Sequence, residues 1–185
     1  MKKGYNLLIL KALEFFIQNP YEEIHLREFS RRLKISVNSS QRFLDLFLHK
    51  GFIKEERKAN LRYFKANIDN IVFRNIKITY SLDRLEEINL ADKLEESKVS
   101  HAVLFGSIGE GKDDVNSDLD IVIIGINKNK VLDLIKEIEH KMHKEVNLHF
   151  FSWHEWKRTY KENKAFYLDV ISKGINLIGE MPIVE

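Results

Sequence analysis

Two aspartates separated by one residue are the part of the sequence best suited to chemistry. Asp118 and Asp120 open an apolar run, IVII, that is typical of a buried strand. Alternate residues of a strand share a face, so we expect the two carboxylates side by side, where they repel each other unless a cation neutralises them. Hard oxygen ligands favour Mg²⁺ or Mn²⁺ over softer ions. The spacing therefore predicts a divalent metal site.

A glycine and a serine precede this pair. Residues 99–105 are predicted to form a buried strand that ends at Gly106 and Ser107, and ten residues separate Ser107 from Asp118. Glycine lets the backbone approach a ligand closely, and serine offers a hydroxyl and a backbone N–H to phosphate oxygens. The two residues indicate a phosphate group beside the metal.

The string LFGSIGEGKDDVNSDLDIVII resembles the nucleotidyltransferase superfamily of DNA polymerase β, and within it the minimal nucleotidyltransferases, some of which are antitoxins that transfer AMP to a partner toxin. The resemblance spans about residues 98–180. It implies a nucleoside triphosphate, ATP, as the substrate, Mg²⁺ (or Mn²⁺) as the cofactor, and a small helical toxin as the protein acceptor. In this resemblance Asp118 and Asp120 hold the metal, and the nucleotide is bound by Gly106, Ser107 and Ser117.

The third carboxylate of the family is replaced in this chain. It stands on a later strand, here residues 145–151, and the residue that aligns with it is Asn147. An amide can ligate a metal through its oxygen, but it brings no charge and cannot act as a base. Glu145 shares the strand face and could substitute for the missing acid in catalysis. The alternative is that catalysis is weakened or lost while nucleotide binding remains.

Other residues of the second half are expected to support this site. Helical spacing over residues 128–142 predicts a helix that connects two strands, and residues 175–178 supply a last strand. His149 shares the face of Asn147 and is either a neighbour of the metal site or part of the sheet packing. Aromatic residues between 153 and 167 are expected to be core or interdomain packing rather than a base-stacking surface.

The first half of the chain is basic. Residues 1–95 carry 18 Lys and Arg against 13 Asp and Glu, whereas the rest carries 12 against 15. Apolar spacing predicts helices over 5–18, 26–33 and 37–50, with Ser36 as an N-cap and Gly51 at the left-handed position after the last helix. Two short strands, at 52–56 and 61–66, flank a turn in which Asn60 is available for a positive φ.

This order of elements resembles a winged helix-turn-helix domain over residues 1–66. A helix of that length fits the major groove, its first residues reach base edges, and basic residues of the hairpin reach phosphates. The alternatives are an ordinary helical domain with a solvated basic face, or a winged domain that serves as a protein contact. The residues expected to contact double-stranded DNA are Arg31, Asn38, Ser39, Arg42, Arg57, Lys58 and Arg62.

Residues 67–97 are predicted to be a helical connector. Ile71, Ile78 and Leu85 recur every seven residues, which is the spacing of a homodimer seam. The alternative is a linker helix that packs on its own two domains.

Composition excludes several classes of protein. The chain has no cysteine, which rules out disulfides, thiolate metal sites and a cysteine nucleophile, and no apolar run is long enough for a membrane span. A cytoplasmic protein of the α+β class is expected, with a winged domain at 1–66, the connector, and a transferase domain with a mixed sheet at 98–185. The expected function is transfer of AMP to a protein hydroxyl; the alternative is a DNA-binding transcription regulator with a degenerate, nucleotide-binding transferase domain.

Overall fold

The computed structural model describes residues 2–126 and 128–184, with side chains described from residue 7 onward. The chain divides into two compact units, residues 1–76 and residues 77–185. The boundary falls inside helix α4 (Ile71–Glu86), so the residues expected as a connector are shared between the two units. In the described part of the chain, every helix is too short or too polar to cross a bilayer.

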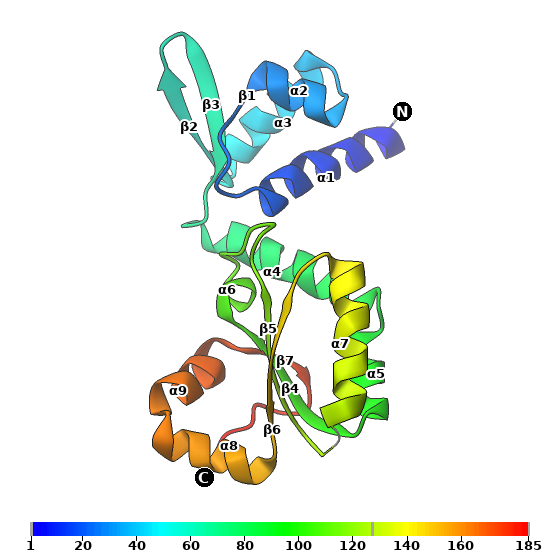
Figure 1. Cartoon of the computed structure of the whole chain (residues 1–185). Coiled ribbons are helices and arrows are strands. Elements are labelled where there is room, and N and C mark those ends of the chain that lie inside the picture. Colours follow the sequence, from blue (N-terminus) through cyan, green and yellow to red (C-terminus); the bar gives the residue numbers. More distant parts are fainter. Residues whose placement is uncertain (1, 127, 185) are drawn as a thin grey trace. The chain divides into compact units, whose positions relative to one another are not determined.

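The first unit has the order of elements that the sequence predicted for a winged helix-turn-helix. One strand between the first two helices and two strands after the third helix form a three-stranded antiparallel sheet in the order β1-β3-β2 (Figure 1). Phenylalanines from the three helices and from β3 fill its core, among them Phe16, Phe29, Phe43 and Phe64. Its elements are α1 (Lys2–Gln18), β1 (Ile24–His25), α2 (Leu26–Leu33), α3 (Val37–His49), β2 (Ile53–Lys58) and β3 (Leu61–Ala66).

Local signals at the ends of α3 are confirmed. The Ser36 hydroxyl accepts a hydrogen bond from the Ser39 backbone N–H at 3.0 Å, and Gly51 has a φ of +69°. The hairpin turn differs in one detail, because Ala59 rather than Asn60 has the positive φ, 53°. Lys58 pairs with Leu61, which leaves a two-residue turn, and turns of that length that match the strand twist need a positive φ at their first residue.

The second unit is an α/β sandwich around a four-stranded sheet in the order β6-β5-β4-β7. β5 and β6 are parallel and the other pairs are antiparallel, so the sheet is mixed as expected. Its further elements are α5 (Leu90–Glu96), β4 (Val99–Phe105), α6 (Gly106–Gly109), β5 (Leu119–Gly125), α7 (Lys128–Met142), β6 (Val146–Phe151), α8 (Trp153–Glu162), α9 (Lys164–Lys173) and β7 (Ile175–Ile178).

Helices cover both faces of this sheet. α5 and α7 lie on one face, and α8 and α9 lie on the other (Figure 1). Strand residues alternate between the two cores: Leu104 and Ile121 pack toward the α5 and α7 side, while Val103 and Val122 pack with Trp156 of α8. Apolar strands covered on both faces explain the uninterrupted hydrophobic runs in the sequence.

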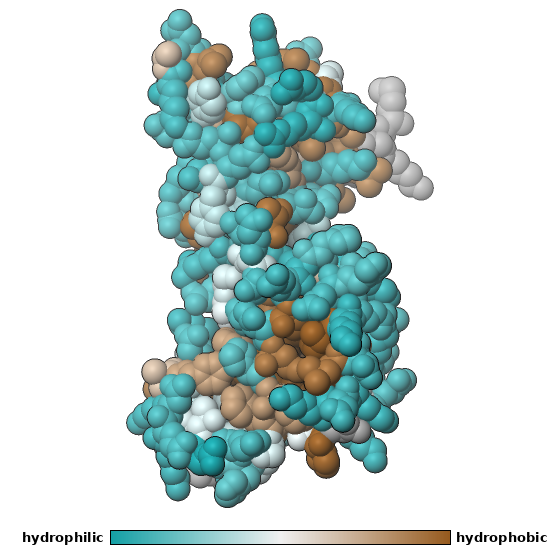
Figure 2. All heavy atoms as spheres, in the orientation of Figure 1, coloured by the Kyte–Doolittle hydropathy of each residue, from teal (hydrophilic) through white to brown (hydrophobic). Residues whose placement is uncertain are grey.

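β6 is an edge strand, and its apolar side chains are only partly covered. Leu148 and Phe150 are partly buried against the core on the α7 side. Figure 2 shows hydrophobic surface in the second unit between β6 and α7. The heptad positions in α4 do not form one common surface, because Ile71 is 64% exposed whereas Leu85 is 3% exposed in the core of the second unit. The homodimer stays a prediction.

Gly174, between α9 and β7, provides a test of this packing. A Cβ at Gly174 would lie 2.3 Å from the Val170 carbonyl oxygen and 2.4 Å from a Val103 methyl group. We expect Gly174→Ala to lower the free energy of unfolding by about 1–3 kcal/mol, because α9 has to shift away from β4. Urea unfolding followed by circular dichroism measures the change.

Gly109→Ala is the matched control for this substitution. Its Cβ would make only ordinary contacts, the nearest at 3.4 Å, and it lies in a helix, where alanine is favoured over glycine. Equal unfolding midpoints for the two variants would contradict the packing described at Gly174.

Candidate functional site

Asp120 and Gly106 are brought together by the pairing of β4 with β5. Phe105, the last residue of β4, pairs with Asp120 near the start of β5, and the chain then turns at Gly106 with a φ of +68°. A Cβ on Gly106 would lie 2.2 Å from Asp120 Oδ2. Only glycine therefore fits between this turn and the carboxylate.

Asp118 and Asp120 both contact the amide of Asn147. Parallel pairing of β5 and β6 sets Asn147 opposite Asp120. Asn147 Nδ2 donates one hydrogen bond to Asp118 Oδ2 and one to Asp120 Oδ1, each 3.1 Å long. Carboxylates accept hydrogen bonds but do not donate them, so the amide must turn its nitrogen toward them. The two acids thus lie side by side, as the sequence predicted, and Asn147 lies between them.

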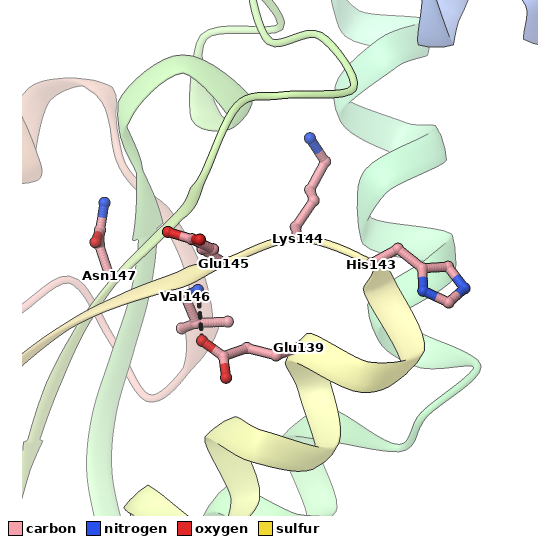
Figure 3. Close-up of a pocket in the computed structure, with 6 residues that line it drawn as sticks. All are labelled: Glu139, His143, Lys144, Glu145, Val146 and Asn147. Carbon is pink, nitrogen blue, oxygen red and sulfur yellow. Dashed lines mark hydrogen bonds between the residues drawn. The ribbon is translucent and has the colours of Figure 1, made fainter.

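Glu145 lies near this group without joining it. Its backbone carbonyl accepts a 2.8 Å hydrogen bond from the Leu119 N–H, which fixes the start of β6 against β5. Figure 3 shows the Glu145 side chain on the same side of the strand as Asn147. In the part of the chain that the structure describes, no group of three or more His, Cys, Asp or Glu is placed to hold a metal. Asp118 and Asp120 are therefore not joined there by Glu145.

A hollow of about 450 Å³ adjoins Asn147 where α7 gives way to β6 (Figure 3). Glu139 lies within it and accepts a 3.1 Å hydrogen bond from the Val146 N–H. Most residues that line the hollow are polar. It lies beside the Asn147 amide, which contacts both aspartates. Its lining residues are Glu139, His143, Lys144, Glu145, Val146 and Asn147.

The Gly-Ser turn opens the short helix α6, and Ser107 lies in its first turn, next to Gly106. Ser117, the other serine assigned to the nucleotide, is tied into the loop before β5. Its hydroxyl donates to Asp114 Oδ1 at 3.0 Å and accepts from the Asp114 N–H at 2.9 Å. The role of both serines in nucleotide binding stays a prediction.

Two lysines that sequence analysis missed contact the same loop. Lys144 Nζ donates to the carbonyl oxygens of Asp114 and Ser117 at 2.6 and 2.8 Å, and Lys77 Nζ lies 3.3 Å from Asp113 Oδ1. Neither lysine belongs to a motif, and each is about 30 residues or more from its partners along the chain. Sequence spacing therefore carries no signal for them.

The charged residues Lys112 and Asp113, in the loop after the Gly-Ser turn, have protein partners. Lys112 pairs with Glu110, and Lys173 of α9 pairs with the same carboxylate. The hydrogen bonds from Lys112 and Lys173 hold the pKa of Glu110 below its usual value. Asp113 is buried beside Lys77.

His149 packs among aromatic rings. Its ring centroid lies 5.5 Å from that of Phe105 and 5.2 Å from that of Phe166. We expected His149 to be either a neighbour of the metal site or part of the sheet packing, and these contacts are those of sheet packing. Trp156 is fully buried in the same core, as expected, whereas Trp153 is 38% exposed and does not meet that expectation.

The residues expected to contact DNA lie on α2, α3 and the hairpin of β2 and β3 in the first unit. Arg62 makes a two-bonded ion pair with Glu55, at 2.8 and 2.6 Å, and Lys58 pairs with Glu23. Among the residues described, Arg31 and Arg42 form no ion pair, and both are exposed. The basic charge of the hairpin is thus partly neutralised within the unit. Arg31 is on α2, α3 carries Asn38, Ser39 and Arg42, and the hairpin carries Arg57, Lys58 and Arg62.

Comparisons with known proteins agree with the geometry of the second unit. The family model described as "Polymerase beta, Nucleotidyltransferase" matches residues 86–178. A search of curated proteins found no match for the chain.

Among solved structures, a toxin-antitoxin crystal structure with AMP-PNP is 21% identical, with 51% of this chain and 73% of that chain covered and a TM-score of 0.39. HlyU from Vibrio cholerae N16961 is 19% identical, with 46% and 97% covered and a TM-score of 0.33. Similarity at this level carries no conclusion about activity. The family model, in contrast, covers half of the chain and includes the Gly-Ser turn and both aspartates, so the chain belongs to the polymerase β nucleotidyltransferase family.

Proposed function

We propose that this chain is a nucleotidyltransferase that uses Mg²⁺ (or Mn²⁺) and ATP to place AMP on a hydroxyl group of a protein. One observation carries the proposal: an oxygen of Asp118 and an oxygen of Asp120 lie at the same distance, 3.1 Å, from a single atom, Asn147 Nδ2. Two carboxylate oxygens that converge on one point form the start of a cation site.

The donor set fits magnesium. Mg²⁺ in nucleotide-dependent enzymes is usually held by one or two carboxylates, with water and substrate phosphates as its other ligands. Asp118 and Asp120 supply the two carboxylates, and Asn147 can supply an amide oxygen if its side chain turns over. When bound, the metal neutralises charge on the phosphates and orients the α-phosphate.

The residues of the turn take the phosphates in this proposal. Gly106 keeps the backbone close to Asp120, and Ser107 offers its hydroxyl and N–H beside it. The acceptor hydroxyl oxygen bonds to the α-phosphorus of ATP, the bond from that phosphorus to the bridging oxygen breaks, and pyrophosphate leaves. Asn147 cannot take the hydroxyl proton. Glu145 is the carboxylate on this side of β6 that remains for that role.

The position of the site favours a macromolecular acceptor. Asp118 and Asp120 are half-buried. Asn147 is exposed and lies on β6, an edge strand of the sheet. A hydroxyl carried on the surface of another protein can reach such a site without passing through a deep pocket. The sequence resemblance to antitoxin transferases makes a small helical toxin the acceptor that we propose.

Labelling with ATP tests this activity. Pure protein, Mg²⁺, α-³²P-ATP and a candidate small helical acceptor protein are incubated together, and the label on the acceptor is measured. We expect labelling that falls about 100-fold or more in Asp118→Asn and in Asp120→Asn, because each change removes a metal ligand. ATP labelled at the γ-phosphate should leave the acceptor unlabelled.

Asp133→Asn is the matched control, since Asp133 is an exposed aspartate of α7 outside the site. Its labelling should equal that of the unchanged protein. Label that persists in both site variants, or that comes from the γ-phosphate, would refute AMP transfer by these residues.

Asn147→Asp tests whether the amide replaces a third acid. Without metal, the variant gathers three carboxylates and loses the bridging donor, so we expect a lower melting temperature in EDTA. We expect its Mg²⁺ affinity to rise about 10-fold, equivalent to about 1.4 kcal/mol, and to appear as a larger increase in melting temperature on adding Mg²⁺.

Asn147→Ala separates the two effects, because it removes the bridge without adding a carboxylate. An Asn147→Asp protein that binds Mg²⁺ no better than Asn147→Ala would show that this position is not part of the metal site.

A second candidate function is DNA binding by the first unit, with the transferase unit as a degenerate nucleotide-binding domain. The observation in its favour is the pair of exposed arginines, Arg31 and Arg42, on the two helices of the helix-turn-helix. Neither forms an ion pair within the described residues, so the charge of each is available to phosphates.

Fluorescence anisotropy with promoter DNA of the protein's own gene tests this role. We expect Arg31→Ala and Arg42→Ala each to weaken binding several-fold and to reduce the salt slope by about 1. Arg62→Ala should weaken binding less, because Glu55 already neutralises Arg62. Asp118→Asn should bind as the unchanged protein does. Binding that is absent or independent of salt would exclude this function.

A further inference from the structure

The loop of residues 110–118 joins α6 to β5 and ends at Asp118. Asp120 lies within β5 and is fixed by strand pairing on both sides. Asp118 precedes the strand, so the position of its carboxylate depends on the loop. The contacts of that loop therefore decide how Asp118 faces Asp120.

Lys144 holds the second half of this loop. Its ammonium donates to two backbone carbonyls, those of Asp114 and Ser117, at 2.6 and 2.8 Å. Hydrogen bonds from a charged donor are shorter and stronger than neutral ones. Lys144 itself directly precedes Glu145, whose carbonyl bonds the Leu119 N–H, so its backbone is fixed beside the start of β5. Burial lowers the pKa of Lys144, and the nearby carboxylates of Asp113 and Asp114 oppose that effect.

Lys77 holds the middle of the loop. The side chain of Lys77 is 1% exposed and that of Asp113 is 9% exposed, and their charged atoms lie 3.3 Å apart. Burial lowers the pKa of Lys77, and the attraction of Asp113 acts against this effect. A buried charge that loses its partner is strongly destabilising, so this pair fixes Asp113 against α4.

The loop also has an internal link close to Asp118. Ser117 and Asp114 form two hydrogen bonds, of 2.9 and 3.0 Å, which close the chain into a compact turn. Ser117 is the residue directly before Asp118. The two lysines and this turn therefore fix residues 113–117, and through them the direction in which Asp118 leaves the loop.

We infer that Lys144 and Lys77 are positioning residues for the metal: they hold residues 113–117 so that the Asp118 carboxylate meets that of Asp120. The inference rests on the proposed function, since it takes Asp118 and Asp120 as metal ligands. Groups that orient metal ligands typically account for 10–100-fold in metal affinity. Loss of Lys144 should therefore weaken metal binding while the sheet and the Asp120 position remain.

Titration of the full chain with Mn²⁺ alone, followed by electron paramagnetic resonance of the free ion, tests this role. We expect Lys144→Met to weaken Mn²⁺ binding at least 10-fold. Lys144→Arg should recover part of that loss, because a guanidinium can also donate to two carbonyls. Lys144→Gln, which removes the charge and shortens the side chain, provides a second variant if the methionine variant does not fold.

Lys93→Met is the matched control. Lys93 pairs with Glu137 at 2.6 Å in the same unit, so its loss removes a lysine ion pair outside the loop. We expect its Mn²⁺ affinity to equal that of the unchanged protein. Thermal unfolding of all variants separates lost stability from lost metal binding.

The outcomes separate this inference from the proposed function. If the unchanged chain binds no Mn²⁺, alone or with ATP present, or binds it equally well after Asp118→Asn, the proposed function fails and the inference fails with it. If the unchanged chain binds Mn²⁺ through Asp118, and folded Lys144→Met or Lys144→Gln binds it equally tightly, the proposed function stands and the positioning role is overturned. A variant that is less stable but keeps its Mn²⁺ affinity also overturns it.

Discussion

The arrangement of the second unit depends on keeping two carboxylates together at one end of the sheet. Asp118 and Asp120 repel each other, and in this structure a single amide, Asn147, contacts both. Other residues near the two carboxylates also help to keep them together. Gly106 leaves space for the Asp120 carboxylate, and Lys144 brings a positive charge to the loop that precedes Asp118. A functional site of this kind therefore needs more residues than its two acids.

The two acids are held by different kinds of structure. Asp120 lies between paired strands, so its position follows from β4 and β6 and is as rigid as the sheet. Asp118 follows a loop whose fixed position comes from charged side chains, Lys144 on its carbonyls and Lys77 on Asp113. Packing in apolar cores tolerates changes in ionic conditions, whereas ion pairs respond to protonation and to neighbouring charges. The position of Asp118, which depends on the two lysines, should therefore respond more to changes in nearby charge than the position of Asp120 does.

Sequence patterns predicted the parts of the fold that follow from periodicity and local capping. The buried strands β4 and β5, the N-cap Ser36 and the adjacent positions of Asp118 and Asp120 all depend on neighbours in sequence. Lys144 and Lys77 could not be predicted, because their partners lie about 30 residues or more away and lysine is common on surfaces. The heptad spacing in α4 shows a related limit: Leu85 is buried by its own unit, which spacing alone does not reveal, and the homodimer stays a prediction.

Asn147 limits the chemistry that this site can perform. Its nitrogen satisfies the two carboxylates, and its oxygen is the atom that a cation would bind, so one orientation of the amide excludes the other role. A cation that enters must replace a pair of hydrogen bonds that already relieve part of the repulsion between the acids. With two carboxylates rather than three, the cation also depends more on ligands brought by the nucleotide phosphates. Metal and nucleotide are therefore expected to bind together more strongly than either binds alone, since each supplies what the other lacks.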